Sequence, residues 1–352
     1  MAITLEELGG WPFVLGKLSQ GADLTSVEAA AALTDVFQGN ATPAQLAAFI
    51  FGLRCKGETV DEMTGLVRAM LEAAEPVPIG EDLRPRLVDT CGTGGDRSGT
   101  INISTIAAFV VAGAGVPVCK HGGRAASSKA GSADLLEELG VAIELGPAGV
   151  ARCIEEAGIG FCFAPRFHQS MRYAIPIRRE LGVATVFNFL GPLANPARVR
   201  RQVVGVSDPA MADKMVGVLR ANGATHTLIV FGHDGLDELT TTDTSTVLEY
   251  HDGAVRTYVV DPIELGLTKA ARSELVGAEA PRNAELARRV LGGEKGAHRD
   301  IVVLNAAAGI VAAGRAADLV DGLIKAEDAI DGGEAERRLL RLAEVSRAES
   351  GR

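Results

Sequence analysis

A glycine-rich turn between an apolar stretch and a hydroxyl-rich stretch constrains this chain more than any other feature. The apolar pair Leu87-Val88 leads into the segment 89–96, where three glycines occur within four positions, and the apolar stretch 106–111 follows soon after. Glycine lets backbone N–H groups approach an anion, and the positive end of the following helix points to the same place. The spacing fits neither the dinucleotide-binding nor the P-loop pattern. The order strand, glycine turn, hydroxyl cluster and helix therefore predicts a phosphate site of another kind.

A second loop of similar chemistry follows the apolar residues 116–118. Lys120 and Arg124 supply positive charge, adjacent glycines expose backbone N–H groups, and serines add hydroxyl donors. This combination favours a second phosphate or pyrophosphate loop over an ordinary solvated basic loop. His121 lies within it, and the sequence leaves open whether it contacts substrate or is a structural histidine.

A third candidate is the carboxylate pair Asp237-Glu238, which follows the apolar stretch 227–231. Adjacent carboxylates at the end of a strand suit Mg²⁺, a hard ion that takes oxygen ligands. Most such pairs are solvated turns. Here the pair gains weight because phosphate loops in a protein of net charge −10 need a metal partner.

The chain divides by pattern into a helical part and an alternating part. Residues 1–75 contain three capping boxes and no strand signal, and Pro76, Pro78 and Gly80 indicate a linker. From about residue 86, short apolar stretches alternate with helical ones. We expect an α/β fold with a small N-terminal helical domain (1–75, which helices near 170–185 join) and a large α/β domain (76–352) with a mostly parallel sheet flanked by helices.

The expected strands include 87–88, 116–118, 142–143, 161–163, 203–206 and 227–231. The expected helices include 106–112, 133–139, 150–157, 210–219 and the tail from about 283.

Charge and cysteine usage limit the class of protein. No block of Lys or Arg offsets the net charge of −10, which disfavours nucleic acid and anionic membranes as partners. The N-terminus lacks a signal pattern, and no apolar run reaches membrane-spanning length. Five scattered cysteines without a C-x-x-C pattern indicate reduced thiols and argue against zinc. We expect a soluble, cytoplasmic protein.

Taken together, the motifs resemble those of the anthranilate phosphoribosyltransferase family. They occur in the order Gly-Thr-Gly-Gly-Asp, Asn-Ile-Ser-Thr, Lys-His-Gly, Gly-Ser-Ala-Asp, Phe-Ala-Pro, Gly-Pro-Leu-x-Asn-Pro and Asp-Glu, and the resemblance extends to about residue 330. It implies a homodimer that transfers phosphoribose from phosphoribosyl pyrophosphate (PRPP) to the amine of anthranilate. The products are N-(5-phosphoribosyl)anthranilate and pyrophosphate, and the pathway is L-tryptophan biosynthesis.

The resemblance also assigns residues. It implies catalytic roles for Lys120 and Arg178, and an anthranilate site at Gly92, Gly123, His168 and Arg178. It implies that Ser104, Asp237 and Glu238 bind Mg²⁺, with two ions per subunit. It places PRPP on Gly92, Gly94, Gly95, Asp96, Thr100, Asn102, Ile103, Ser104, Thr105, Lys120, His121, Gly122, Gly123, Arg124, Ala125, Ala126, Ser127, Ser128 and Ser132.

Two departures from the family's usual sequence lie in the part that the resemblance assigns to the acceptor. Gly123 stands where the family usually has Asn, and Gln169-Ser170 stands where it tends to have Pro-Ala. One alternative is therefore a phosphoribosyltransferase that acts on another aromatic amine or nitrogen base. A pyrimidine nucleoside phosphorylase shares the architecture, but the Asp-Glu pair and the Asn-Ile-Ser-Thr run favour PRPP. A non-catalytic relative that binds nucleic acid conflicts with the negative charge.

Overall fold

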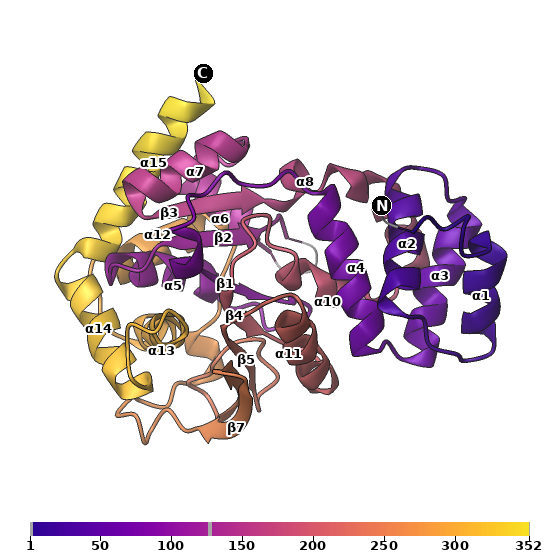
Figure 1. Cartoon of the computed structure of the whole chain (residues 1–352). Coiled ribbons are helices and arrows are strands. Elements are labelled where there is room, and N and C mark those ends of the chain that lie inside the picture. The colour runs from indigo at the N-terminus through magenta and orange to yellow at the C-terminus, as the bar shows by residue number, and fades with distance from the viewer. Residues whose placement is uncertain (1–2, 126–128, 352) are drawn as a thin grey trace.

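The computed structural model describes residues 3–125 and 129–351. An N-terminal helical part lies beside a seven-stranded sheet that has helices on both faces (Figure 1). This layout confirms the α/β fold class expected from the sequence. No helix in the described ranges is long and apolar enough to cross a membrane.

The helical part contains α1 (Gly10–Ser19), α2 (Ser26–Phe37), α3 (Pro43–Lys56) and α4 (Val60–Ala73). The three expected capping boxes are confirmed at the starts of α2, α3 and α4, and Pro43 is the first residue of α3. In each box the Thr hydroxyl accepts from a backbone N–H that would otherwise lack a partner at the helix start. The residue pairs are Thr25 with Glu28, Thr42 with Gln45 and Thr59 with Glu62.

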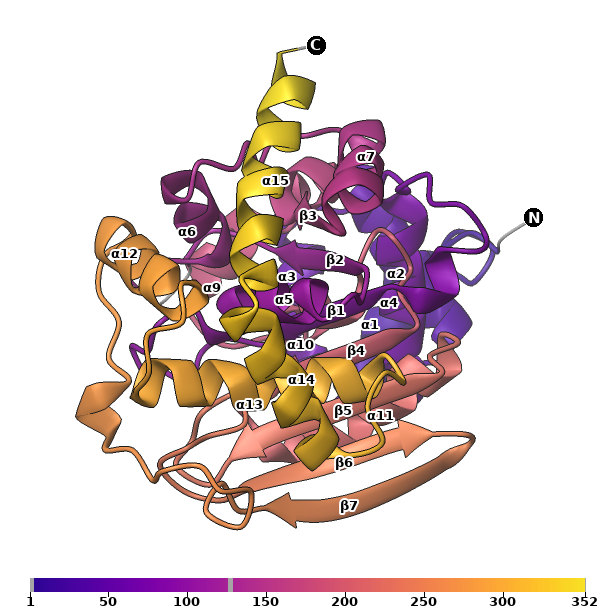
Figure 2. The ribbon, with the colours of Figure 1, turned by 90° about the vertical axis from the view of Figure 1, so that its left-hand side faces the viewer.

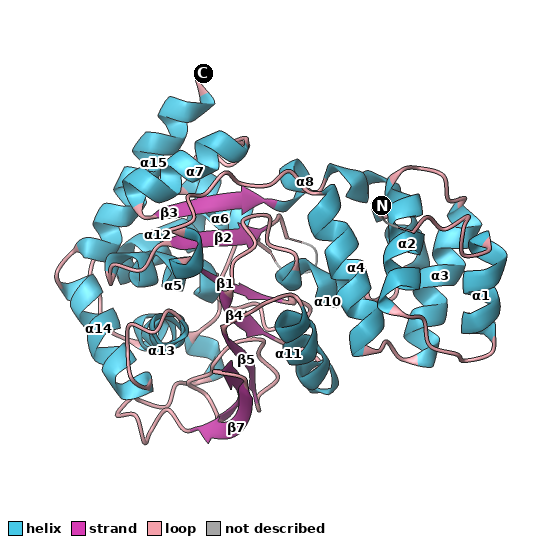
Figure 3. Cartoon of the chain, in the orientation of Figure 1, coloured by secondary structure: helices cyan, strands magenta, loops and turns pink. Residues whose placement is uncertain are grey.

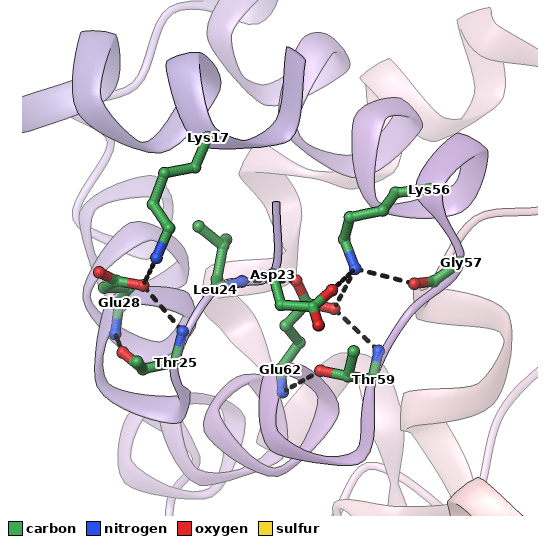
Figure 4. Close-up of polar contacts among 9 residues, drawn as sticks. All are labelled: Lys17, Asp23, Leu24, Thr25, Glu28, Lys56, Gly57, Thr59 and Glu62. Atoms are coloured by element: carbon green, nitrogen blue, oxygen red, sulfur yellow. Dashed lines mark hydrogen bonds and ion pairs between the residues drawn. The ribbon is translucent and has the colours of Figure 1, made fainter. Parts of the chain in front are cut away.

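Two of these boxes also tie helices together (Figure 4). The Glu28 carboxylate accepts from Lys17 Nζ of α1 at 2.8 Å. The Glu62 carboxylate accepts from Lys56 Nζ at 3.0 Å and from the backbone N–H of Leu24 at 2.9 Å. Because Glu62 is fully buried, the lysine that balances its charge fixes the approach of α3 to the start of α4.

The sheet has the order β3-β2-β1-β4-β5-β6-β7. Its first five strands run parallel, and β6 and β7 are antiparallel to their neighbours, which confirms the mostly parallel sheet. The strands are β1 (Val88–Gly92), β2 (Val118–Gly122), β3 (Ile159–Phe163), β4 (Arg201–Gly205), β5 (His226–Gly232), β6 (Ser245–His251) and β7 (Ala254–Val260).

One expected strand is wrong, and two strands are additional to those expected. Residues 142–143 form a loop between two helices, because Ile143 packs into the core while the Ala142 N–H donates to Ser346 Oγ instead of to a strand. The two additional strands, β6 and β7, contain mixed polar and apolar residues. Strand β7 is the exposed edge of the sheet, and β6 lies next to it. They lack the apolar run by which buried parallel strands are recognised.

The helices divide between the two faces of the sheet. In Figure 2 the C-terminal helices α13 (Ala297–Ala312), α14 (Leu319–Asp331) and α15 (Glu334–Ser350) lie in front of the sheet. Figure 3 shows α11 (Ala212–Ala221) on the side that faces the helical part, where it contacts α4. The remaining helices are α5 (Ile103–Gly113), α6 (Ser132–Glu138), α7 (Pro147–Ala157), α8 (Ala164–Phe167), α9 (Ile175–Leu181), α10 (Phe187–Leu190) and α12 (Ala280–Leu291), with short 3₁₀ turns at 84–86, 169–173, 191–193, 209–211 and 272–274.

An apolar core among the described residues joins the helical part to the sheet. It includes Leu46 and Met70 from the N-terminal helices together with Val204 of β4 and Met215 of α11. Helix α9 packs against α3, so the segment 170–185 lies against the helical part. The domain boundary near residue 75 stays a prediction, because this core crosses it.

Candidate active site

The motifs expected to bind phosphate and metal meet at one edge of the sheet. Strands β1, β2, β4 and β5 are parallel, and the register pairs Gly92 with Gly205 and Gly122 with Phe163. The glycine turn after β1, the lysine loop after β2 and the carboxylate pair after β5 therefore leave the sheet at the same edge. In open parallel sheets this carboxyl edge is where ligands bind.

Glycines allow the carboxylate segment to lie directly on the strand ends. A Cβ at Gly92 would lie 2.5 Å from Asp237 Oδ2, and a Cβ at Gly205 would lie 1.5 Å from the Asp237 backbone oxygen. Gly94 and Gly95 have φ angles of 66° and 87°, which favour glycine. Sequence reasoning singled out Gly92, Gly94 and Gly95 but missed Gly205, which belongs to an ordinary-looking strand.

Three acidic side chains crowd this edge. Asp237 Oδ2 accepts from the Gly94 N–H at 2.7 Å, and burial followed by repulsion from Asp96 raises the pKa of Asp237 to about 8. Burial and the charge of Asp237 also raise the pKa of Glu238 well above its ordinary value. A cluster of one buried and two half-buried carboxyl groups with a neighbouring hydroxyl is a donor set that suits a hard divalent cation.

Lys120 lies beneath these carboxylates and is 2% exposed. Its Nζ donates to the Thr90 backbone oxygen at 2.5 Å and to Ser104 Oγ at 3.3 Å. Its charge opposes the rise in the pKa values of Asp89 and Glu238. The lysine is therefore held in place by β1 and α5 before any ligand arrives.

A buried network behind Lys120 was not found by sequence reasoning. Asp89 accepts from Asn195 Nδ2 at 2.9 Å and from the His121 N–H at 3.2 Å, and Asn195 Nδ2 also donates to the Cys119 backbone oxygen at 2.8 Å. The sequence motif Gly-Pro-Leu-x-Asn-Pro supplies this asparagine, which links the glycine-turn strand to the lysine strand.

The hydroxyl and amide residues of the predicted PRPP site hold its loops together. Asn102 Nδ2 donates to the Ala130 backbone oxygen at 2.9 Å, and Thr105 Oγ1 donates to Ser132 Oγ at 3.1 Å. Thr100 forms a bridge to residue 276. Ile103 begins α5 with its side chain in the core.

Arg124 makes contacts within its own loop region. Its guanidinium pairs with Asp134 at 2.9 Å and with Glu137 at 2.5 Å, and it lies 5.6 Å from the centre of the Phe163 ring. The Ala125 N–H donates to Asp134 at 3.1 Å. The predicted phosphate ligands Ala126, Ser127 and Ser128 lie outside the described residues.

His121 of the predicted PRPP site lies beside His168 of the predicted anthranilate site. The rings of His121 and His168 are 5.1 Å apart, and burial lowers their pKa values to about 3 and about 4. His121 Nδ1 and His168 Nε2 each bond a backbone oxygen, of Gly191 and Ala194 respectively. Both rings are therefore neutral at physiological pH.

Arg178 differs from its neighbour Arg179. The Arg178 guanidinium is partly buried and lies 5.2 Å from the centre of the Phe187 ring, whereas Arg179 is exposed. Burial lowers the pKa of Arg178, and it forms no ion pair with a carboxylate in the described ranges. Gly123 borders open space, because a Cβ there would have no described heavy atom within 4 Å.

Known proteins share both parts of this chain. Residues 84–336 match the model of a glycosyl transferase family α/β domain, and residues 13–74 match its helical bundle domain. The chain is 52% identical over 332 residues to anthranilate phosphoribosyltransferase of Roseiflexus castenholzii, which covers 94% of this chain and 96% of that protein.

Solved structures agree with this similarity. The structure of anthranilate phosphoribosyltransferase from Thermus thermophilus is 42% identical with a TM-score of 0.89, and covers 95% of this chain and 99% of that one. The Saccharomyces cerevisiae enzyme in complex with PRPP and Mg is 28% identical with a TM-score of 0.87, and covers 96% and 98% of the two chains. The yeast enzyme has also been solved with 4-fluoroanthranilate.

Proposed function

This chain belongs to the anthranilate phosphoribosyltransferase family, and we propose that it transfers phosphoribose from PRPP to the amine of anthranilate. The observation that carries the proposal is the meeting of the glycine turn, buried Lys120 and the Asp237-Glu238 pair at one sheet edge. The relatives that share both domains carry this activity in their names.

The reaction exchanges one bond at the sugar. A bond forms between the anthranilate nitrogen and C1 of the ribose, the bond from C1 to pyrophosphate breaks, and the amine loses one proton. Negative charge grows on the leaving pyrophosphate, where Lys120 and the N–H groups of the glycine turn supply positive charge. An aromatic amine has a free lone pair, so no strong base has to act before attack. The neutral His121 and His168 fit this requirement.

The acidic cluster fits Mg²⁺. We assign Asp237, Glu238 and Ser104 as the residues that hold it, two ions per subunit, with Asp96 next to Asp237. When bound, Mg²⁺ supplies charge neutralisation for pyrophosphate. The protein's own part is to fix the Asp237 carboxylate through the Gly94 N–H group.

Arg178 is the group we assign to the anthranilate carboxylate. A guanidinium without a carboxylate partner matches a planar carboxylate with two parallel hydrogen bonds. Its position over Phe187 limits its rotation, which favours one binding geometry.

Loss of anthranilate fluorescence tests the proposal. Consumption that requires both PRPP and MgCl₂ supports the assigned reaction. Tight PRPP binding without consumption of anthranilate would support the assigned PRPP site and show that the acceptor is another compound. A screen of aromatic amines then tests the second candidate, another acceptor, which the open space at Gly123 favours.

We also propose a homodimer in the cytoplasm. Phe13 of α1, Phe51 of α3 and Ile175 of α9 are exposed, and a second copy of the chain would cover such apolar side chains. All five cysteines are free thiols, as expected in a reducing compartment. Light scattering on a sizing column measures the mass, and Phe51→Glu is expected to give the monomer.

A further inference from the structure

Two histidines and a glutamate gather at the end of the sheet remote from the proposed active site. His226 begins β5 and lies directly opposite His251, which ends β6, while Glu249 lies two residues earlier on the same face of β6. One potential ligand atom from each side chain lies within 4.8 Å of the others. The carboxylate pair of the active site follows the other end of β5, so the two clusters are separate.

Glu249 fixes the proton of His226. Arg256 Nε and the Tyr258 hydroxyl donate to Glu249 Oε2, which leaves Oε1 of the same carboxylate for His226. His226 Nε2 donates to Oε1 at 2.8 Å, so Nε2 carries the hydrogen. In the neutral ring, His226 Nδ1 then presents a lone pair.

That nitrogen is an unusual feature. His226 is 4% exposed, and its Nδ1 is buried with no hydrogen-bond partner among the described residues. Leaving a buried acceptor unsatisfied costs about 1–3 kcal/mol in general, so such atoms often mark a site for a missing ligand.

His251 supplies a second nitrogen at the surface. Its ring stacks on His226 with centres 4.0 Å apart, and its side chain is 49% exposed. Two stacked rings cannot share one ion, because each metal–nitrogen bond lies in the plane of its ring. Shared coordination therefore requires the half-exposed His251 ring to turn out of the stack, while His226, which is 4% exposed, keeps its position.

We propose that His226 and His251 bind a divalent transition-metal ion of the Zn²⁺ or Ni²⁺ class. Glu249 then orients His226 through its other ring nitrogen, an arrangement common around histidine-bound metals. Imidazole ligands select such ions over Mg²⁺. Water completes the coordination, and Asp252, whose carboxylate lies 3.6 Å from His251 Nε2, is a further oxygen donor.

The expected consequence is structural. The ion would join the start of β5 to the end of β6, where the sheet changes from parallel to antiparallel. It would raise the melting temperature without taking part in the reaction, because a ligand that binds the folded state alone stabilises it.

Calorimetric titration with NiCl₂ tests the proposal on the full chain in saturating MgCl₂, which fills the carboxylate site. We expect one Ni²⁺ per chain, and at least about tenfold weaker binding in His251→Ala. This variant changes a half-exposed residue and should fold. His233→Ala is the matched control, because His233 is also an exposed histidine at an end of β5.

A second variant separates ligation from general surface binding. Glu249→Gln keeps the shape of the side chain but weakens the orienting bond, and we expect about 10- to 100-fold lower Ni²⁺ affinity. Equal affinity in wild type and His251→Ala would overturn the proposal, as would the absence of binding by the wild type. Loss of binding in Cys55→Ser would also overturn it, because the exposed thiol would then be the ligand.

Discussion

The donor side and the acceptor side of the proposed active site are built in opposite ways. On the donor side, Lys120, Asp89 and Asp237 are buried and already bonded to neighbouring groups. On the acceptor side, Arg178 forms no ion pair with a described carboxylate, and Gly123 borders open space. Charge stabilisation requires groups fixed in advance, whereas recognition of a flat acceptor requires a vacant guanidinium and room.

The two sides also differ in how protons affect them. Burial and like charge raise carboxyl pKa values on the donor side, while burial lowers the pKa of His168 on the acceptor side. The donor side is thus a cluster of acidic groups whose mutual repulsion a bound cation would reduce. The acceptor side carries no charged histidine at neutral pH.

Replacement of Lys120 tests the donor side most severely. Lys120→Met removes the buried positive charge, and we expect kcat to fall about 100- to 1,000-fold, as when a preorganised donor is removed from a transition state. The KM for anthranilate should change little. Steady-state fluorescence assays measure both constants, with Lys214→Met of α11 as the control for loss of a lysine.

Replacement of Arg178 tests the acceptor side. Arg178→Ala should raise the KM for anthranilate about 10- to 100-fold, since a charged hydrogen-bonded contact contributes about 1.5–3 kcal/mol. The KM for PRPP should stay the same. Arg179→Ala is the matched control, because that neighbouring arginine is exposed; an equal effect of both variants would remove Arg178 from the site.

The pH dependence of stabilisation by Mg²⁺ tests the acidic cluster. The pKa of Asp237 is about 8 in the folded chain, above its ordinary 3.8, so the folded state holds this proton more tightly. The contribution of Asp237 to the free energy of unfolding is therefore present at low pH and is lost as pH rises through about 8. Mg²⁺ should raise the melting temperature more at about pH 8.5 than at about pH 6.5. Asp237→Asn should reduce that difference.

The smallest expected effect concerns Gly123. Since a side chain there meets open space, Gly123→Asn should leave the melting temperature unchanged. An added amide that bonds the acceptor should lower the KM for anthranilate about two- to fivefold. An unchanged KM would show that the glycine does not weaken acceptor binding.

The fold class and the meeting of the main site motifs were predictable from the sequence. The long-range contacts within the site were not, for physical reasons. Parallel strands bring their carboxyl ends together, so Gly94, Lys120 and Asp237 could be placed at one edge from pattern alone. The bond between Asn195 and Asp89 joins residues 106 positions apart, and no local pattern encodes it. The close approach of the Asp237 backbone to Gly205 likewise joins two segments that are distant in the sequence.

The error at residues 142–143 has a related origin. A short apolar pair indicates burial, but it does not show where the backbone N–H groups bond. Here one of them donates to Ser346 in the last helix. The pairing of Arg124 with Asp134 and Glu137 of α6 is likewise a tertiary contact that no local pattern encodes.

Rescue by substrate tests the central contrast most directly. The rates of Lys120→Met and Arg178→Ala are measured while PRPP and anthranilate are each raised to saturation. The division of roles predicts that saturating anthranilate restores most of the rate of Arg178→Ala, and that neither substrate restores Lys120→Met. Restoration of Lys120→Met by anthranilate, or failure to restore Arg178→Ala, would contradict it.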